Sequence, residues 1–369
     1  MPALSPRERL DRLRLARSEN VGPVTFQRLI ERFGSAGAAL EALPNLARQG
    51  GRRGPVRLCP EADALREVEA VEQLGARLLV LGDDAYPAPL SAIADPPPAL
   101  SVLGDIALLF RPSIALVGAR NASAAGRRFA RTLAGEIGQA GLVVVSGLAR
   151  GIDTASHEGA LATGTIAVVA GGVDVVYPEE NRALHGQIAG QGAIVAEMPP
   201  GTEPIAALFP RRNRTISGLA LGTVVVEAAL RSGSLITARQ ALDQGREVFA
   251  VPGSPQDPRA RGANDLIRQG ATLVEGAADI LAVLGPAAGT HPRPPAKELK
   301  KKDNSPSMSG LDVNETRNKV LILLSPTPVA VDEIVRQCQL SPATVSLVLL
   351  ELELAGRLER HPGNQVSIL

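Results

Sequence analysis

The residues best suited to chemistry in this chain gather between Phe209 and Thr237. A basic cluster, Arg211, Arg212, Asn213 and Arg214, stands at the predicted start of a helix. A predicted strand at Val224–Val226 follows, and the small residues Ser232-Gly233-Ser234 then open a second helix. Guanidinium groups donate paired hydrogen bonds to oxyanions, and backbone N–H groups at a helix start also bind anions. We therefore expect this stretch to bind an anionic ligand at the ends of parallel strands.

The bulk composition limits the kind of nucleic-acid contact that is possible. The net charge is +1 over 369 residues, so no general basic field covers the surface. Aromatic residues make up 2% of the chain, fewer than a single-strand binder built on stacking platforms usually has. Any affinity for nucleic acid must therefore come from a local patch.

The cysteines and the hydropathy pattern bear on where the protein works. Cys59 and Cys338 lie far apart without metal-ligand spacing, which predicts two free thiols in a reducing compartment and no metal site. The first residues are charged and lack the apolar core of a signal peptide. No apolar run approaches the ~20 residues of a membrane span. We expect a cytoplasmic protein without a membrane span.

Short β-branched runs organise the middle of the chain, at Ile114–Val117, Leu142–Val145, Ile166–Ala170, Ile194–Ala196, Val224–Val226 and Val248–Val251. Glycine and then a helical stretch follow each run. Continuous apolar strands that alternate with helices are typical of a parallel sheet covered on both faces. The predicted fold class is α/β, with this sheet domain at residues 113–284.

The flanking segments predict further domains. Residues 1–80 show helical apolar stripes around the turn Val21-Gly22-Pro23. That turn resembles a helix-hairpin-helix element, which either offers backbone N–H groups to a DNA phosphate or simply packs two helices together. Residues 81–112 are rich in Pro and Asp and predict an ordered connector. Residues 285–311 have a flexible-linker composition, and their lysines, at 300–302, are either solvated or in contact with nucleic acid.

The last segment, residues 312–369, predicts a winged helix. Helices are expected at Thr316–Leu324, Val331–Gln337 and Ser341–Ala355, and strands at Arg357–Arg360 and Gln365–Ile368. The third helix carries Glu351 and Glu353 but no Lys or Arg, and the segment holds five basic and seven acidic residues. A helix that reads a DNA groove is not built this way. The composition favours a protein-contact or regulatory module.

The strand exits narrow the choice of ligand. Ligands of open parallel sheets bind at the carboxyl ends of the strands, where this chain places Gly118, Gly147 and Gly172. No GxGxxG dinucleotide fingerprint and no GxxxxGK[ST] phosphate loop is present. The pattern favours several shallow phosphate sites in a row over one deep nucleotide cradle.

Residues that could support catalysis are few. Asp153 and His157 share one face of a predicted helix, either as a catalytic pair or as a helix-start acid beside a packing histidine. Glu227 ends a strand, either as a general base or as a buried acceptor for arginine or backbone N–H groups. Ser146 has no base at a recognisable spacing. We expect no enzymatic activity and no cofactor.

Together these runs resemble the DNA-processing protein DprA (Smf) family. The resemblance rests on long motifs in the family's order: VGAR at Val117–Arg120, VVSGLARGIDTASHEGAL at Val144–Leu161, GGVDVVYPEEN at Gly171–Asn181, FPRRNRTISGL at Phe209–Leu219, VVVEAALRSGSLITA at Val224–Ala238 and GREVFAVPG at Gly245–Gly253. The helical N-terminal segment, the DPPPAL connector and the winged-helix tail extend the resemblance to nearly the whole chain.

The resemblance implies a fold, an activity and partners. The fold would be an extended Rossmann-like sheet domain with an N-terminal all-α domain, of the SAM or helix-hairpin-helix type, and a C-terminal winged helix. The implied function is sequence-independent binding of single-stranded DNA and loading of the recombinase RecA onto incoming strands in natural transformation. The implied assembly is a homodimer through the Rossmann-like domain.

The resemblance also implies site residues. Phosphates would be held by Arg120 and by the basic cluster from Arg211 to Arg214. Backbone or hydroxyl donors would come from Gly118, Ser146, Gly147, Gly172, Ser232, Gly233 and Ser234. Phe209 would either flank a base or pack at a helix start.

Two features set limits on this reading. The family often has Ser or Thr where this chain has Ala119, so a hydroxyl contact is lost there. The same sheet also resembles nucleoside-monophosphate phosphoribohydrolases, which carry a PGGxGTxxE run. This chain reaches VVVEA from Thr223 without the two glycines, so that enzyme is the weaker alternative.

Overall fold

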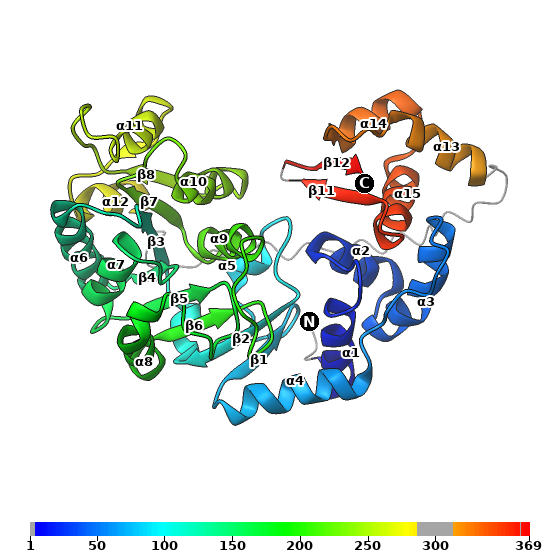
Figure 1. Ribbon diagram of the computed structural model, residues 1–369, viewed down its shortest axis with the longest axis horizontal. Helices are drawn as coiled ribbons and strands as arrows, with labels where there is room; N and C mark the ends of the chain where they lie inside the picture. The colour runs from blue at the N-terminus through cyan, green and yellow to red at the C-terminus, as the bar shows by residue number, and fades with distance from the viewer. Residues whose placement is uncertain (1–3, 286–312, 362) are drawn as a thin grey trace. The chain divides into compact units, whose positions relative to one another are not determined.

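The computed structural model describes residues 4–285, 313–361 and 363–369, which fall into two compact units (Figure 1). One unit begins at Leu65 and contains a nine-stranded sheet. The other joins Leu4–Ala64 to the winged helix. The predicted linker at residues 285–311, with its lysine run at 300–302, lies outside the described residues except for Gly285.

The large sheet is mostly parallel. Its strand order is β1-β2-β6-β5-β4-β3-β7-β8-β9, and only β2 runs antiparallel to its neighbours, β1 and β6. The strands are β1 (Arg77–Val80), β2 (Ala99–Gly104), β3 (Ser113–Gly118), β4 (Val143–Ser146), β5 (Thr165–Val169), β6 (Ala193–Ala196), β7 (Gly222–Val226), β8 (Glu247–Ala250) and β9 (Thr272–Leu273). All six predicted strands are confirmed within one or two residues at each end.

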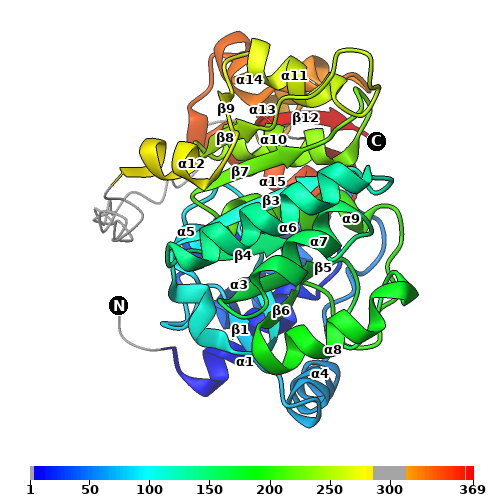
Figure 2. The ribbon, with the colours of Figure 1, turned by 90° about the vertical axis from the view of Figure 1, so that its left-hand side faces the viewer.

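Helices cover both faces of the sheet, as the apolar runs predict. Successive strand residues point to opposite faces, so Val117 and Val145 enter one core while Leu116 and Val144 enter the other. Helices α5 (Ala88–Ser91), α9 (Leu208–Leu219), α10 (Gly233–Asp243) and α11 (Arg261–Arg268) contribute to the first core. Helices α6 (Ala124–Gln139), α7 (Ile152–Ala160) and α12 (Ala277–Leu284) contribute to the second, and α6 and α7 lie in front of the sheet in Figure 2. Helix α8 (Arg182–Gln191) covers a third cluster near β6.

The sheet extends further toward the N-terminus than the sequence patterns predicted. Residues 77–80 form β1 although a helix was expected there, and the predicted connector contains β2, the short α5 and a 3₁₀ turn at Ile106–Phe110. Strand β2 is hydrogen-bonded to both β1 and β6. These two strands are recognisable only from their long-range pairing, because the prolines and aspartates around them are typical of turns.

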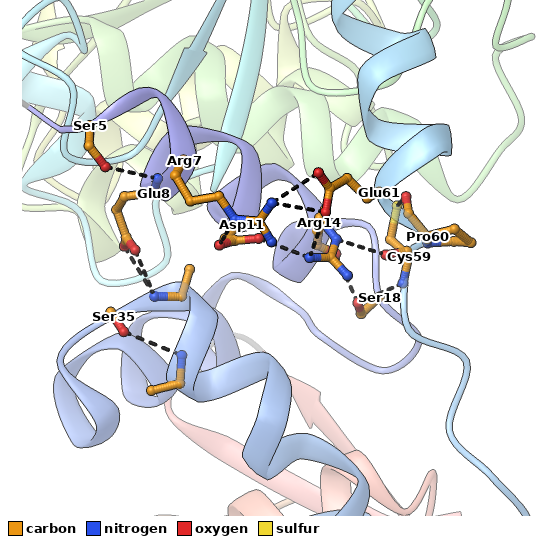
Figure 3. A network of polar contacts seen from close by, with 12 residues as sticks. Ser5, Arg7, Glu8, Asp11, Arg14, Ser18, Ser35, Cys59, Pro60 and Glu61 are labelled. Carbon is orange, nitrogen blue, oxygen red and sulfur yellow. Dashed lines mark hydrogen bonds and ion pairs between the residues drawn. The ribbon is translucent and has the colours of Figure 1, made fainter.

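Ion pairs hold the N-terminal helices together (Figure 3). They are α1 (Pro6–Ala16), α2 (Pro23–Phe33), α3 (Ala36–Gln49) and the start of α4 (Glu61–Gln73). Buried Asp11 accepts hydrogen bonds from Arg7 Nε and Arg14 Nη1, each at 2.9 Å, and Arg7 also pairs with Glu61 at 2.9 Å. The charges of this segment therefore join α1 to α4.

The C-terminal residues fold as the predicted winged helix. Helices α13 (Val313–Leu323), α14 (Val331–Cys338) and α15 (Pro342–Leu354) pack around one apolar core with a sheet of order β10-β12-β11. The strands are β10 (Val329–Ala330), which the sequence did not predict, β11 (Leu358–His361) and β12 (Gln365–Ile368). Ser341 caps α15 by accepting the Thr344 N–H at 3.1 Å.

The cysteines and the helix lengths bear on two further expectations. Cys59 and Cys338 take part in no disulfide bond, as predicted. Within residues 4–285, 313–361 and 363–369, every helix is too short or too polar to cross a bilayer.

Candidate nucleic-acid interface

A cavity of about 410 Å³ opens at the carboxyl ends of β3, β4 and β5. This is the edge of a parallel sheet where ligands bind. Its walls come from four loops and the start of α9: Arg120, Asn121, Gly147, Ala149, Arg150, Val169, Ala170, Gly171, Val175, Tyr177, Pro178, Pro204, Phe209 and Arg212. Four of the predicted site residues meet here, namely Arg120, Gly147, Phe209 and Arg212.

An aromatic pair flanked by two guanidinium groups forms one wall of the cavity. The rings of Tyr177 and Phe209 lie 5.7 Å apart between centroids with an interplanar angle of 59°. The guanidinium carbon of Arg120 lies 5.2 Å from the Phe209 centroid and that of Arg212 lies 5.8 Å away. Tyr177 is 48% exposed, so its ring is open to a ligand. Aromatic faces beside cations suit a nucleobase and its phosphate.

Sequence reasoning missed two residues of this cavity, Tyr177 and Arg150. Tyr177 stands in the GGVDVVYPEEN run and is one of only two tyrosines in the chain. Arg150 stands in SGLARGID, directly before the start of α7. Both lie in the family motifs, where an exposed aromatic and an exposed cationic side chain are signals that could have identified them.

The loop after β4 is held rigidly beside the cavity. Asp153 accepts the N–H groups of Gly147 at 3.2 Å and Ala149 at 3.3 Å, and Arg212 donates to the Gly147 carbonyl at 2.5 Å. Leu148 adopts a left-handed backbone with φ of 53°, and its carbonyl accepts Asn181 Nδ2 at 2.8 Å. A Cβ on Gly147 would lie 1.7 Å from the Arg212 guanidinium, so a side chain there would displace Arg212. The cavity wall is therefore preorganised.

His157 belongs to this scaffold and has no access to a substrate. It is fully buried; the Leu148 N–H donates to its Nε2 at 3.3 Å, and its Nδ1 lies 2.7 Å from Thr165 Oγ1. The Thr165 hydroxyl uses its one proton to donate to the Val144 carbonyl at 3.0 Å. It can therefore only accept from the imidazole, and we assign the histidine proton to Nδ1. Burial, reinforced by Arg212, lowers the pKa of His157 to about 3. Of the two sequence interpretations, the packing histidine fits the geometry.

Arg212 serves the scaffold and the cavity at once. Its side chain is 6% exposed and donates to the carbonyls of Gly147 and Val168, while its buried Nε has no partner. Burial lowers the pKa of Arg212 to about 10, with Asp153 opposing and Arg120 adding to the shift. The guanidinium remains a cation at neutral pH and lies against the aromatic pair.

The rest of the basic cluster from Arg211 to Arg214 divides between surface and interior. Arg211 is exposed. Arg214 is buried, where it pairs with Glu197 at 2.9 Å and Asp95 at 3.1 Å. Although burial opposes the charge of Arg214, these two carboxylates raise its pKa. Ion pairs therefore occupy the Arg214 guanidinium inside the domain, away from the cavity walls.

Asn213 and the Ser232-Gly233-Ser234 turn meet each other at the contact between α9 and α10. Asn213 Nδ2 donates to the Gly233 carbonyl at 3.5 Å. Ser232 caps α10, and its hydroxyl lies 2.7 Å from that of Ser234. These four predicted donors lie together but outside the walls of the 410 Å³ cavity.

Three further predicted donors are engaged in packing. The Ser146 hydroxyl is fully buried and donates to the Leu116 carbonyl at 2.5 Å. A Cβ on Gly118 would lie 2.0 Å from the Val226 carbonyl oxygen, and one on Gly172 would lie 2.6 Å from the Asp174 carboxylate. Gly118 and Gly172 therefore allow close packing, while the neighbouring Gly171 lines the cavity.

Glu227 acts as an acceptor that joins two strand exits. Its carboxylate accepts the Ser123 N–H at 2.9 Å and the Ser123 hydroxyl at 2.5 Å. This geometry fits the interpretation of Glu227 as a structural acceptor for a backbone N–H group. Within the part of the chain that the structure describes, no three His, Cys, Asp or Glu side chains gather as metal ligands would.

Three family models match consecutive parts of the chain. DNA recombination-mediator protein A matches residues 77–285, which is more than half of the chain. The DprA-like N-terminal HHH domain matches residues 6–70, and the DprA winged helix domain matches residues 304–364. The match to DNA recombination-mediator protein A begins at residue 77, which is also the first residue of β1.

Curated relatives and solved structures agree with these matches. Protein Smf of Escherichia coli is 40% identical over 301 residues, which cover 81% of this chain and 79% of that protein. Protein Smf of Synechocystis is 32% identical, and the match covers 94% of this chain and 95% of that protein. The structure of DNA processing protein A from Streptococcus pneumoniae aligns with a TM-score of 0.63 at 34% identity, covering 76% of this chain and 98% of that one.

A second solved structure carries a description of its ligand. It is DNA processing protein A from Helicobacter pylori, described with a unique single-stranded DNA binding mode. It aligns with a TM-score of 0.52 at 30% identity and covers 57% of this chain and 95% of that one.

Proposed function

The chain belongs to the DNA recombination-mediator protein A family, the DprA or Smf proteins, and from this premise we propose that it binds single-stranded DNA without sequence preference. The observation that carries the proposal is the cavity wall in which exposed Arg120 lies 5.2 Å from the Phe209 ring beside Tyr177. A base stacks on an aromatic face whatever its identity, and an arginine beside it neutralises the adjacent phosphate. The described ligand of the H. pylori relative supports the same ligand class.

The walls of the cavity favour contact with base faces and phosphates. Gly147 and Gly171 line the cavity without side chains, and Arg120 and Arg150 supply exposed charge. Such binding does not require side chains that hydrogen-bond to the edges of particular bases. Affinity would therefore depend on strand flexibility and salt more than on sequence.

The finer parts of the proposal concern partners. We propose that the protein forms a homodimer through its sheet domain in the cytoplasm. In this proposal it delivers the bound strand to RecA during transformation or recombination. A dimer would let one strand engage two cavities, and such bivalent binding raises avidity by ~10²-fold or more.

We further propose that the protein is not an enzyme. Asp153 and His157 are committed to holding the loop after β4, and Glu227 is committed to Ser123. The alternative, a phosphoribohydrolase on the same sheet, predicts release of a base from a nucleoside monophosphate. An assay for that release checks it directly.

The test is fluorescence anisotropy of labelled oligo-dT with the wild type, Arg120→Ala and Arg239→Ala. Arg239 is an exposed arginine on α10 that does not line the cavity. Loss of a hydrogen bond to a charged group costs about 1.5–3 kcal/mol, so we expect Arg120→Ala to bind roughly 10- to 100-fold more weakly. Arg239→Ala should bind as the wild type does, and duplex DNA should compete poorly.

Equal binding by wild type and Arg120→Ala would reject the cavity as the DNA site. A test of RecA delivery measures the lag before RecA filaments form on the same oligo-dT. The wild type and Arg239→Ala should both shorten that lag, and Arg120→Ala should not.

A further inference from the structure

A second cavity, of about 350 Å³, lies beside the first on the surface of α6 and α7. Its walls are Arg127, Arg131, Arg150, Gly151, Thr154, Ala155, Glu158 and Asn181. Arg127 and Arg131 stand one helical turn apart on α6, and side chains four residues apart share one helix face. Arg150 lines both cavities, so the two hollows meet at its side chain.

The second cavity carries a local positive charge. Three of its wall residues are arginines, and Glu158 is the one acidic residue among the walls. Arg131 pairs with Glu158, Arg150 pairs with Glu180 at 2.9 Å, and Arg127 donates to the Ala122 carbonyl at 3.2 Å. The side chains of Arg131 and Arg150 are 54% and 63% exposed. Exposed ion pairs contribute little stability, so both guanidiniums can turn toward an anion at small cost.

We propose that the second cavity binds the phosphates of the strand segment that adjoins the nucleotide in the first cavity. This inference rests on the proposed function and extends its site along α6. A polyanion fits the arrangement, because cations follow one another from Arg120 through Arg150 to Arg127 and Arg131. A single small anion would need only one of these positions. The path explains how a chain of net charge +1 presents four arginines to one strand.

The test compares two probe lengths on the full chain. Single-strand sites in other folds span about 4–16 nucleotides, so the probes are oligo-dT of about 4 and about 12 nucleotides. The variant Arg127→Ala/Arg131→Ala is matched by Arg128→Ala/Arg268→Ala, which removes the same two charges from exposed positions outside both cavities.

We expect the Arg127→Ala/Arg131→Ala variant to bind the short probe as the wild type does. It should bind the long probe at least tenfold more weakly, with a log–log salt slope flatter by about 1.4, at 0.7 per phosphate. The matched control should bind both probes normally. Equal binding of the long probe by variant and wild type would overturn the second site alone. Failure of the wild type to bind either probe would overturn the proposed function as well.

A separate observation concerns α15, the helix that enters the DNA groove in DNA-reading winged helices. Its residues Val345, Val348, Leu349 and Leu352 belong to the winged-helix core. Leu350 and Leu354 are 3% and 0% exposed although neither belongs to that core. Helix α15 also packs on α2 and α3 within one compact unit.

The contact between α15 and the N-terminal helices is built around glycines. A Cβ on Gly50, just after α3, would lie 1.9 Å from the Glu351 carbonyl oxygen, and one on Gly22 would lie 3.8 Å from the Glu353 carboxylate. Asn20 Nδ2 donates to the Leu354 carbonyl at 3.2 Å, and Arg357 Nη1 donates to the Gly50 carbonyl at 3.4 Å.

The two bodies that meet at this contact differ in net charge. Residues 4–64 contain eleven basic and seven acidic residues, and residues 312–369 contain five basic and seven acidic. The two bodies thus carry net charges of opposite sign.

From these contacts we infer that α15 is a protein-docking helix whose partner is the N-terminal helical domain of the same chain. While docked, it takes no part in DNA binding and places Glu353 beside the turn Val21-Gly22-Pro23.

Gly50→Ala tests this inference, with Gly54→Ala as its matched control. Gly50 has φ of −66°, which alanine adopts freely, so the added methyl meets only the winged helix. Gly54 is exposed and a Cβ there meets nothing within 4 Å.

Hydrogen exchange on the full chain should show at least tenfold faster exchange along α15 residues 349–354 in Gly50→Ala. The Gly54→Ala variant should leave it unchanged, and the sheet domain should serve as the internal folding check in both. Wild-type exchange along α15 in Gly50→Ala would overturn the docking.

Discussion

At the scale of single residues, the site depends on side chains that hold one another in place. Arg212 fixes the Gly147 carbonyl and lies against Phe209, so substituting it would disturb both the loop and the cavity wall. Arg120 touches the same ring but is exposed. An experiment on DNA binding is therefore cleaner at Arg120 than at Arg212, because loss of function at Arg212 would also report damage to the scaffold.

His157 links this scaffold to pH. Its pKa is about 6.5 in an unfolded chain and about 3 when buried here. The unfolded form therefore binds more protons between these values, and stability falls as pH falls from about 6.5 toward 3. Burial raises the pKa of Asp153, with Arg212 opposing, so that carboxyl acts in the other direction: its protonation favours the folded form as pH falls.

We expect His157 to account for about 2 kcal/mol of the unfolding free energy lost between pH 7 and 5, from linkage. The measurement is urea unfolding at both pH values for wild type and His157→Gln. Asp153 contributes to both proteins, so the difference in their pH dependence isolates His157. A variant with the wild-type pH dependence would show that His157 takes up protons in the folded state.

At the scale of elements, the strand-to-helix loops determine what the sheet edge can bind. The loop after β4 is bonded to α7, α9 and the 3₁₀ turn at Glu179–Asn181 (Figure 1). Three elements distant in sequence thus hold Gly147 and Ala149 at the cavity. This bonding explains why the motifs that contribute to the cavity also contain a residue, Asp153, that lines neither cavity.

The edge of the large sheet beyond β6 is formed by two strands that the sequence patterns did not predict. Strands β1 and β2 extend the parallel sheet by antiparallel pairing next to β6. Ser101, in the middle of β2, is buried together with its neighbours Leu100 and Val102. The Pro-rich segment before β2 therefore positions a core strand and is more than a spacer between domains.

At the scale of the whole molecule, the charge distribution matters more than the total. A net charge of +1 cannot attract DNA from a distance. The two cavities nevertheless place Arg120, Arg150, Arg127 and Arg131 along one path. The electrostatic potential of the protein is therefore weak at long range and strong beside these arginines. We expect binding to be governed by the release of counterions where the arginines meet phosphates.

A salt titration of the wild type measures that release. If about 4 phosphates are neutralised, the log–log slope should lie near −3. A fourfold rise in salt should then weaken binding of a long oligo-dT by roughly 50-fold. A slope near zero would mean that stacking alone holds the strand, and the arginine path would play no part.

The parallel sheet, the winged helix and the family are all predictable from local sequence patterns. Each leaves a local signal: buried parallel strands are continuous apolar runs, and the family motifs are contiguous stretches such as FPRRNRTISGL. The same local reading picked Arg120, Gly147, Phe209 and Arg212 for the site, and these four line the cavity.

Only the tertiary structure decided how the remaining residues are used. Arg212 and Arg214 are two positions apart and chemically identical, yet one lies on the cavity wall and the other pairs with Glu197 and Asp95. Strands β1 and β2, the exposed ring of Tyr177 and the docking of α15 also depend on partners far away in the chain. The physical reason is that burial and pairing are set by neighbours in space, which a local pattern of residue types does not specify.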